Sequence, residues 1–90
     1  MKIYISGKNG FIGSNLAKYL SSLSYDIITQ ELRLNDLDLL RQLKPDAIIH
    51  CAARVGSCKC QKDYLDTYIS NILVTCSIAL MAKVIDTYFI

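Results

Sequence analysis

Short apolar runs alternate with longer amphipathic segments along this chain. Residues 1–6, 26–30 and 47–53 are compact runs rich in isoleucine, and each predicts a β-strand. The third run, "AIIHCAA", contains no acidic or basic side chain apart from its histidine, which is typical of a central parallel strand covered on both faces. Residues 87–90, "TYFI", predict the start of a fourth strand.

The segments between these runs show helical spacing. Ile12, Leu16, Leu20 and Leu23 recur at every third or fourth position, so we predict a helix over residues 11–22 whose apolar stripe faces the sheet. We also expect a short extended piece over residues 32–34 and a helix over residues 63–83. A further helix is expected over residues 37–43, with Asn35 or Asp36 as its N-cap.

The alternation of strand and helix with short connections predicts the fold class. Parallel strands joined by helical crossovers form an α/β layer, and this order corresponds to the first half of a doubly wound fold. We therefore expect a partial doubly wound parallel sheet, Rossmann-like, with about four strands, formed by residues 1–90 as one unit.

Charge and hydropathy narrow the classes of partner. A net charge of +2 with scattered Lys and Arg residues does not favour nucleic acid. The apolar run over residues 72–82 is shorter than the roughly 18–20 residues that span a bilayer, and Lys83 follows it, so we expect no membrane segment.

The cysteines, at positions 51, 58, 60 and 76, follow an amino terminus without a secretory signal. We therefore expect free thiols and a cytoplasmic location. Cys58 and Cys60 form a closely spaced pair, but the sequence lacks the second pair that would complete a structural zinc site, so no metal site is predicted.

Three glycines lie between the first predicted strand and the first predicted helix, in "SGKNGFIG". Gly7 would permit a sharp turn off the strand, Gly10 would let a pyrophosphate approach the backbone, and Gly13 would let the helix pack closely on the sheet. The free N–H groups at the start of the helix would face the phosphates. Between a strand and an amphipathic helix, this pattern predicts a dinucleotide site, with a turn that binds no ligand as the alternative.

An acidic residue is expected about 20 positions after the glycines, where it accepts hydrogen bonds from the adenosine ribose. Glu31 stands there, at the end of the second predicted strand, and its charge favours NAD because it would repel the 2′-phosphate of NADP. A solvated charge at a strand end is the alternative interpretation of Glu31. Lys8 and Arg33 would attract a 2′-phosphate, so NADP also stays open.

These motifs together resemble the extended short-chain dehydrogenase/reductase family of NAD-dependent nucleotide-sugar epimerases, dehydratases and reductases. The family opens with T-G-x-x-G-F-I-G, and Ser6 replaces the threonine here. "KPDAIIHCAA" is similar to the family's P-D-x-V-I-H-x-A-A strand, and "YISNILVT" to its Y-x-x-N-V-x-G-T helix, with Val74 where glycine is usual. "ELRLND" resembles the E-L-D-L-T-D stretch of the keto-sugar reductases, and "AARVG" resembles the A-A-x-V-G-G of GDP-fucose synthases.

The resemblance implies a cofactor site and the residues that form it. The implied cofactor is NAD, with NADP as the alternative, and the substrate of the intact family is a nucleotide sugar. Glu31 would hold the adenosine ribose, and Asn71 would be the family's helix asparagine or an ordinary polar residue on a helix face. The residues that would line the pyrophosphate are Gly7, Gly10, Phe11, Ile12 and Gly13. Ala52 and Ala53 would lie along the nicotinamide side of the cofactor.

The catalytic residues of that family are missing from this sequence. The family uses a Ser or Thr and a Tyr-x3-Lys pair that follow the fourth strand, and the one Tyr-x3-Lys here, Tyr4 to Lys8, crosses a strand and a turn. His50 is expected to be packed and hydrogen-bonded rather than catalytic. We therefore predict the N-terminal portion of an NAD(P)-binding Rossmann domain, a fragment without catalytic and substrate-binding parts, which self-associates through uncovered apolar faces.

Two functions stay open at this point. The first is the NAD(P)-binding segment of an enzyme that transfers hydride to or from a nucleotide sugar. The second is a non-catalytic nucleotide-binding or interaction module, derived from a degenerate or truncated relative.

Overall fold

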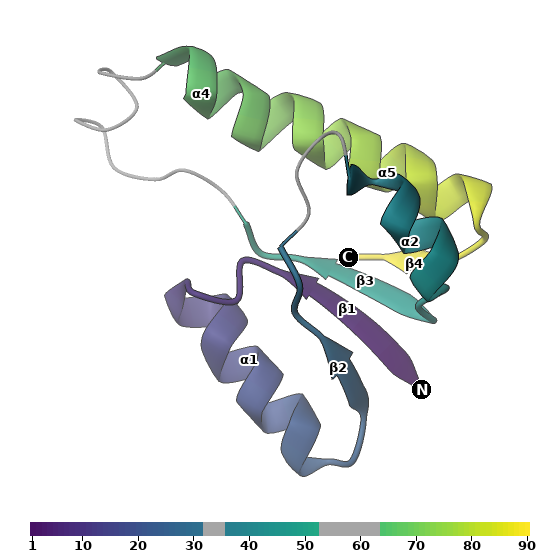
Figure 1. The fold of residues 1–90 in the computed structure, drawn as a ribbon. Helices are drawn as coiled ribbons and strands as arrows, with labels where there is room; N and C mark the ends of the chain where they lie inside the picture. Colours follow the sequence, from purple (N-terminus) through teal and green to yellow (C-terminus); the bar gives the residue numbers. More distant parts are fainter. Residues whose placement is uncertain (32–35, 53–63) are drawn as a thin grey trace.

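The computed structural model describes residues 1–31, 36–52 and 64–90, which form a four-stranded sheet with helices on both faces (Figure 1). All neighbouring strands are parallel, and their order is β2-β1-β3-β4. The predicted α/β parallel sheet is therefore confirmed. The strands are β1 (Lys2–Ser6), β2 (Asp26–Ile28), β3 (Ala47–His50) and β4 (Tyr88–Phe89).

The helices lie in two layers, one on each side of the sheet (Figure 1). Helix α1 (Phe11–Ser22) covers one face. The other face carries α2 (Asp38–Leu43) and a long helical segment made of α4 (Tyr64–Tyr68), the π-helical turn η2 (Ile69–Leu73) and α5 (Val74–Val84). None of the helices in these described ranges combines the length and the hydropathy needed to cross a bilayer.

The side chains of β1 alternate between two apolar cores, because successive residues of a strand point to opposite faces. Ile3 and Ile5 are buried on the α1 side, where Leu16, Ala17 and Leu20 pack against them. Tyr4 is buried on the opposite side, beneath α2 and α5. The residues buried with Tyr4 are Leu37, Leu40, Ile48, Ile78 and Ala82.

Helix α1 has the predicted bounds, but its buried stripe differs from the prediction. Leu16 and Leu20 pack on the sheet as expected, whereas Ile12 is 69% exposed and Leu23 is 51% exposed. The residue that approaches the sheet at the start of α1 is the buried Gly13. Because Gly13 faces inward, its neighbour Ile12 is turned outward by about 100° around the helix axis.

Several element ends also differ from the sequence-based expectation. β2 ends at Ile28 and β3 ends at His50, earlier than predicted, because β1 pairs with them only as far as Tyr4 and Ser6, respectively. Leu37, rather than Asp36, occupies the N-cap position of α2. The π-helical turn η2 was not predicted. The expected extended piece over residues 32–34 and the alternative cap Asn35 lie outside the described residues.

The connection between β1 and α1 requires glycine at two positions. Gly7 has a φ of +82°, in the left-handed region, and a Cβ atom on it would lie 2.8 Å from the backbone nitrogen of Ala52. A Cβ atom on Gly13 would overlap the carbonyl oxygen of Gly7. Gly7 therefore lets the end of β1 contact the chain that follows β3, and Gly13 lets α1 contact the turn.

The substitution Gly13→Ala tests the contact between α1 and the turn, because the two explanations predict opposite changes in the free energy of unfolding. Helix propensity alone predicts that alanine stabilises a helix interior by about 1 kcal/mol relative to glycine. We expect the opposite, a loss of about 1–3 kcal/mol in the free energy of unfolding, because the added methyl group must displace α1 from the turn. Chemical denaturation measures this change.

Gly10→Ala is the matched control. A Cβ atom at Gly10 would lie 3.4 Å from the Gly7 carbonyl oxygen, an ordinary contact, so we expect a change below about 1 kcal/mol. Equal stability changes in the two variants would contradict the proposed packing.

Candidate functional site

The start of α1 presents unpaired backbone N–H groups. The N–H of Gly10 donates to the carbonyl of Gly7 over 3.0 Å, and the first helical hydrogen bond runs from the N–H of Ser14 to the carbonyl of Gly10, also 3.0 Å. The N–H groups of Phe11, Ile12 and Gly13 precede this bond and have no acceptor within the helix. Gly10 has no side chain to cap them, and the first turn of α1 contains no acidic residue. The positive end of the helix dipole is therefore not compensated by an anion of α1 itself.

Gly10 differs from the other two glycines of this turn. The N-cap residue Gly10 has a φ of −80°, which any residue adopts, and its position has room for a Cβ atom. The described fold thus does not require glycine here, although the absence of a side chain leaves the backbone open on the outer side. A group that lies directly against the start of α1 would make use of this opening.

A recess of about 140 Å³ lies at the carboxyl edge of the sheet, next to this turn. It adjoins the ends of β1 and β3, the two central strands. The chain moves outward from β1 to β2 and then crosses back to β3 on the other side, so the strand order reverses between β1 and β3. Such a switch point is where ligands bind in open α/β sheets.

The structure brings three of the predicted site residues together in this recess. Gly7, Glu31 and Ala52 all line it. Glu31 is exposed, just beyond β2, so its carboxylate is accessible to a ligand. The other predicted residues of the turn, Gly10, Phe11, Ile12 and Gly13, form the start of α1, and Ala53 lies outside the described residues.

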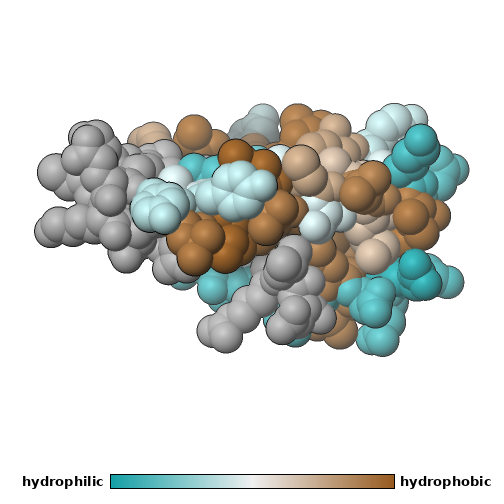
Figure 2. Space-filling view, turned by 90° about the horizontal axis from the view of Figure 1, so that it is seen from above, coloured by the Kyte–Doolittle hydropathy of each residue, from teal (hydrophilic) through white to brown (hydrophobic). Residues whose placement is uncertain are grey.

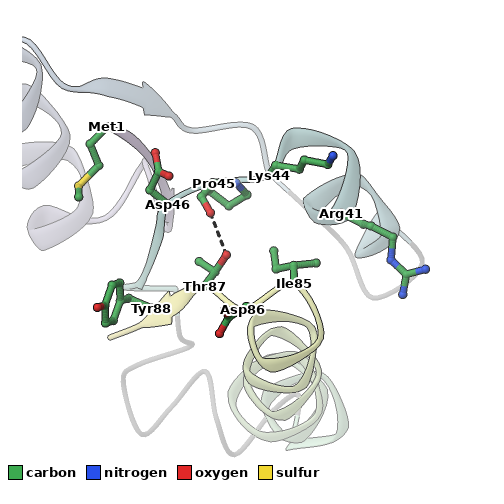
Figure 3. A pocket seen from close by; sticks show the side chains of 9 residues that line it. All are labelled: Met1, Arg41, Lys44, Pro45, Asp46, Ile85, Asp86, Thr87 and Tyr88. Carbon is green, nitrogen blue, oxygen red and sulfur yellow. Dashed lines mark hydrogen bonds between the residues drawn. The ribbon is translucent and has the colours of Figure 1, made fainter.

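A larger recess, of about 520 Å³, lies at the opposite end of the strands (Figure 3). Met1 and Asp46 line it from the amino ends of β1 and β3, and the hydroxyl of Thr87 donates a hydrogen bond to the carbonyl of Pro45 over 2.8 Å. Ligands of doubly wound folds bind at the carboxyl ends of the strands. The smaller recess beside the glycine turn is therefore the candidate site.

His50 also lines the candidate site, and both nitrogens of its ring have partners. Nδ1 is 2.6 Å from the Ser6 hydroxyl oxygen, and Nε2 is 2.7 Å from the Thr75 hydroxyl oxygen. The ring also stacks on Phe89, with 6.2 Å between the ring centroids. Burial lowers the pKa of His50 and so favours the neutral imidazole. The expectation of a packed, hydrogen-bonded histidine is confirmed.

Sequence reasoning did not identify Ser6 and Thr75 as partners of His50. Each of the three residues belongs to one of the family motifs. They lie on β1, β3 and α5, however, and no pattern in the sequence indicates that they are in contact. Only the packing of α5 over the sheet brings them into contact.

The structure does not place the Tyr-x3-Lys pattern on a helix. Tyr4 is buried in β1, and Lys8 is exposed in the turn, so the two residues do not share a helix face. Among the described residues, no group of three or more His, Cys, Asp or Glu side chains is arranged to hold a metal ion. Cys51 is a half-buried free thiol and Cys76 is an exposed one, while Cys58 and Cys60 lie outside the described residues.

Solved structures with a similar fold include enzymes that act on nucleotide sugars. The dTDP-4-dehydrorhamnose reductase of Yersinia enterocolitica is 29% identical, with a TM-score of 0.82, over 98% of this chain and 33% of that chain. The dTDP-4-dehydrorhamnose reductase of Bacillus anthracis in complex with NADP is 23% identical, with a TM-score of 0.86, over 98% of this chain and 34% of that chain. The UDP-glucose 4-epimerase of Brucella ovis in complex with NAD is 22% identical, with a TM-score of 0.81, over 96% of this chain and 33% of that chain.

The last two similarities show the fold alone, and this chain spans about a third of the length of each of these proteins. A comparison with curated proteins finds no match. The sequence model of the NAD dependent epimerase/dehydratase family matches residues 3–89, nearly the whole chain, in agreement with the resemblance seen in its motifs. The chain therefore belongs to the NAD dependent epimerase/dehydratase family.

Proposed function

We propose that this chain is the NAD(P)-binding segment of a nucleotide-sugar epimerase, dehydratase or reductase, with residues 1–90 as the N-terminal portion of the Rossmann domain. The observation that carries the proposal is the uncapped start of α1 beside the recess at the switch point between β1 and β3. Family membership supports the same assignment. The cytoplasmic location expected from the sequence stays a prediction.

The glycine turn fits a pyrophosphate. The N–H groups of Phe11, Ile12 and Gly13 would donate to phosphate oxygens, and the helix dipole would stabilise their negative charge. Gly10 would let the phosphates approach the backbone, which explains a glycine that the fold does not need. The side chains of Phe11 and Ile12 are 86% and 69% exposed, so neither is packed against the protein at this turn.

Residues that line the recess would contact the two nucleoside ends of the cofactor. Glu31 would accept hydrogen bonds from the adenosine ribose, and its negative charge would favour NAD over NADP. Ala52, on the other side of Gly7, would lie along the nicotinamide side, as would Ala53. The nicotinamide supplies the chemistry when it is bound, because it accepts or donates a hydride. The solved relatives with NADP and with NAD support both cofactors as candidates.

A non-catalytic nucleotide-binding or interaction module is the second candidate. The N–H groups at the start of α1 and the exposed carboxylate of Glu31 would bind an adenine nucleotide in that case as well. A Tyr-x3-Lys pair encoded in frame after codon 90 would favour the enzyme, and its absence would favour the module.

Titration with NAD and NADP tests the proposed site. We expect the wild-type chain to bind NAD more tightly than NADP, and Glu31→Gln to weaken NAD binding by about tenfold and reduce the preference between the two cofactors. Isothermal calorimetry or fluorescence titration measures the dissociation constants.

Asp26→Asn is the matched control for this experiment. It removes the same charge from an exposed residue at the opposite end of β2, so the affinity for NAD should stay unchanged. The proposal fails if neither dinucleotide binds the wild-type chain with a dissociation constant below roughly 1 mM, which corresponds to about 4 kcal/mol.

Self-association is the remaining part of the proposal. Apolar side chains gather on the outer face of the long helical segment (Figure 2). The exposed residues that recur along it at multiples of four positions are Tyr64, Tyr68, Ile72, Leu80 and Val84. An exposed apolar surface of this kind favours association with another such surface.

Sedimentation velocity over a range of protein concentrations tests self-association. We expect the wild-type chain to shift towards larger species as the concentration rises, and Leu80→Lys to shift it back towards monomer because it introduces a charge into this face. Leu23→Lys, at an exposed position after α1, should behave as the wild type. A wild-type chain that stays monomeric at all concentrations would refute self-association.

A further inference from the structure

Ser6 joins the ends of the two central strands through its side chain. The Ser6 hydroxyl oxygen accepts the N–H of Cys51 over 3.1 Å and the N–H of Ala52 over 3.2 Å. The Cys51 N–H is also 3.2 Å from the Ser6 carbonyl oxygen, so it has a second acceptor. Among the described residues, the acceptor of the Ala52 N–H is the Ser6 hydroxyl oxygen.

The direction of the next hydrogen bond follows from the acceptor capacity of a hydroxyl group. A serine oxygen has two lone pairs and one proton, and two N–H groups already point at this oxygen. Its proton must therefore go to the remaining neighbour, Nδ1 of His50 at 2.6 Å. Nδ1 can accept this proton only when it carries none of its own.

The tautomer of His50 is then determined. With Nδ1 unprotonated, a neutral imidazole carries its proton on Nε2, and this N–H donates to the hydroxyl oxygen of Thr75 at 2.7 Å. The burial that lowers the pKa of His50 supports the neutral form. Both ring nitrogens are used inside the protein, so the ring has no free polar atom for a ligand or for proton transfer to a substrate.

We propose that Ser6, His50 and Thr75 form a directed hydrogen-bond chain from α5 to β1 that positions the backbone of Ala52 at the edge of the candidate cofactor site. His50 is a positioning residue in this chain, because it acts on Ala52 through the Ser6 hydroxyl. A Cβ atom on Gly7 would lie 2.8 Å from the same backbone nitrogen of Ala52, so the hydroxyl and the absence of a side chain at Gly7 together determine where the chain runs after β3. The effect on cofactor affinity rests on the proposed function, whereas the hydrogen-bond chain itself does not.

Nuclear magnetic resonance tests the tautomer directly, because His50 is the only histidine in the sequence. In protein labelled with ¹⁵N-histidine, long-range ¹H–¹⁵N correlations should show a protonated Nε2 and an unprotonated Nδ1. Ser6→Ala and Thr75→Val each remove one end of the chain and should shift the ring towards a mixture of tautomers. A wild-type ring with its proton on Nδ1, or already in a mixture, would overturn the proposal.

Amide hydrogen exchange tests the positioning of Ala52 without any ligand. We expect the Ala52 N–H to exchange about tenfold faster in Ser6→Ala than in the wild type, and at the wild-type rate in Ser6→Thr, which keeps the hydroxyl. Ser22→Ala makes the same chemical change at an exposed serine whose hydroxyl donates to the carbonyl of Tyr19, and it should leave the rate unchanged. Equal exchange rates in the wild type and Ser6→Ala would show that the hydroxyl does not position Ala52.

Cofactor titration of the same variants separates this inference from the proposed function. Measured on the folded fraction of each variant, NAD should bind Ser6→Ala about tenfold more weakly than the wild type, with recovery in Ser6→Thr. Equal losses in both variants would mean that the space at position 6, and not the hydroxyl, sets the affinity, which overturns the positioning role. If the wild type binds no dinucleotide, the proposed function fails, while the tautomer and the exchange rate of Ala52 still decide the hydrogen-bond chain.

Discussion

The close contact between the turn after β1 and the chain after β3 is the constraint on which the rest of this structure depends. Gly7 lies against the backbone of Ala52, and Gly13 lies against the carbonyl of Gly7, so three segments meet without intervening side chains. This contact places the start of α1 beside the edge of the sheet. The unpaired N–H groups of α1 and the recess between the central strands are neighbours as a result.

The two faces of the sheet differ in the side chains that they present at the carboxyl edge. Ile3 and Ile5 form a purely apolar contact with α1 and hold that helix in place. On the other face, Tyr4 continues the apolar core beneath α2 and α5, whereas Ser6 and His50 extend the same face as polar residues at the carboxyl edge. Tyr4 and Ser6 share this face because alternate residues of a strand point to the same side, and the polar residues at its end place hydrogen-bonding groups where the candidate cofactor site begins.

The turn and the acidic residue after β2 were predictable because each is a local signal. Glycine spacing after a strand and an acidic residue at the end of the next strand indicate the same local structure in any Rossmann-like fold. The outward position of Ile12 was not predictable, since helical spacing alone assigned it to the sheet-facing stripe. The inward face of α1 is decided by the contact between Gly13 and Gly7, which joins residues on two different elements.

The sequence by itself determined the order of strands and helices, the parallel sheet and the glycine turn, because these depend on local apolar patterns and on the conformational freedom of glycine. The tertiary structure alone decided which residues of that pattern face one another across the sheet. Ser6, His50 and Thr75 are far apart in the chain, and they make hydrogen bonds only because α5 packs over the end of β3, which is paired with β1. Contacts between side chains on separate elements depend on register and packing, and no local pattern encodes them.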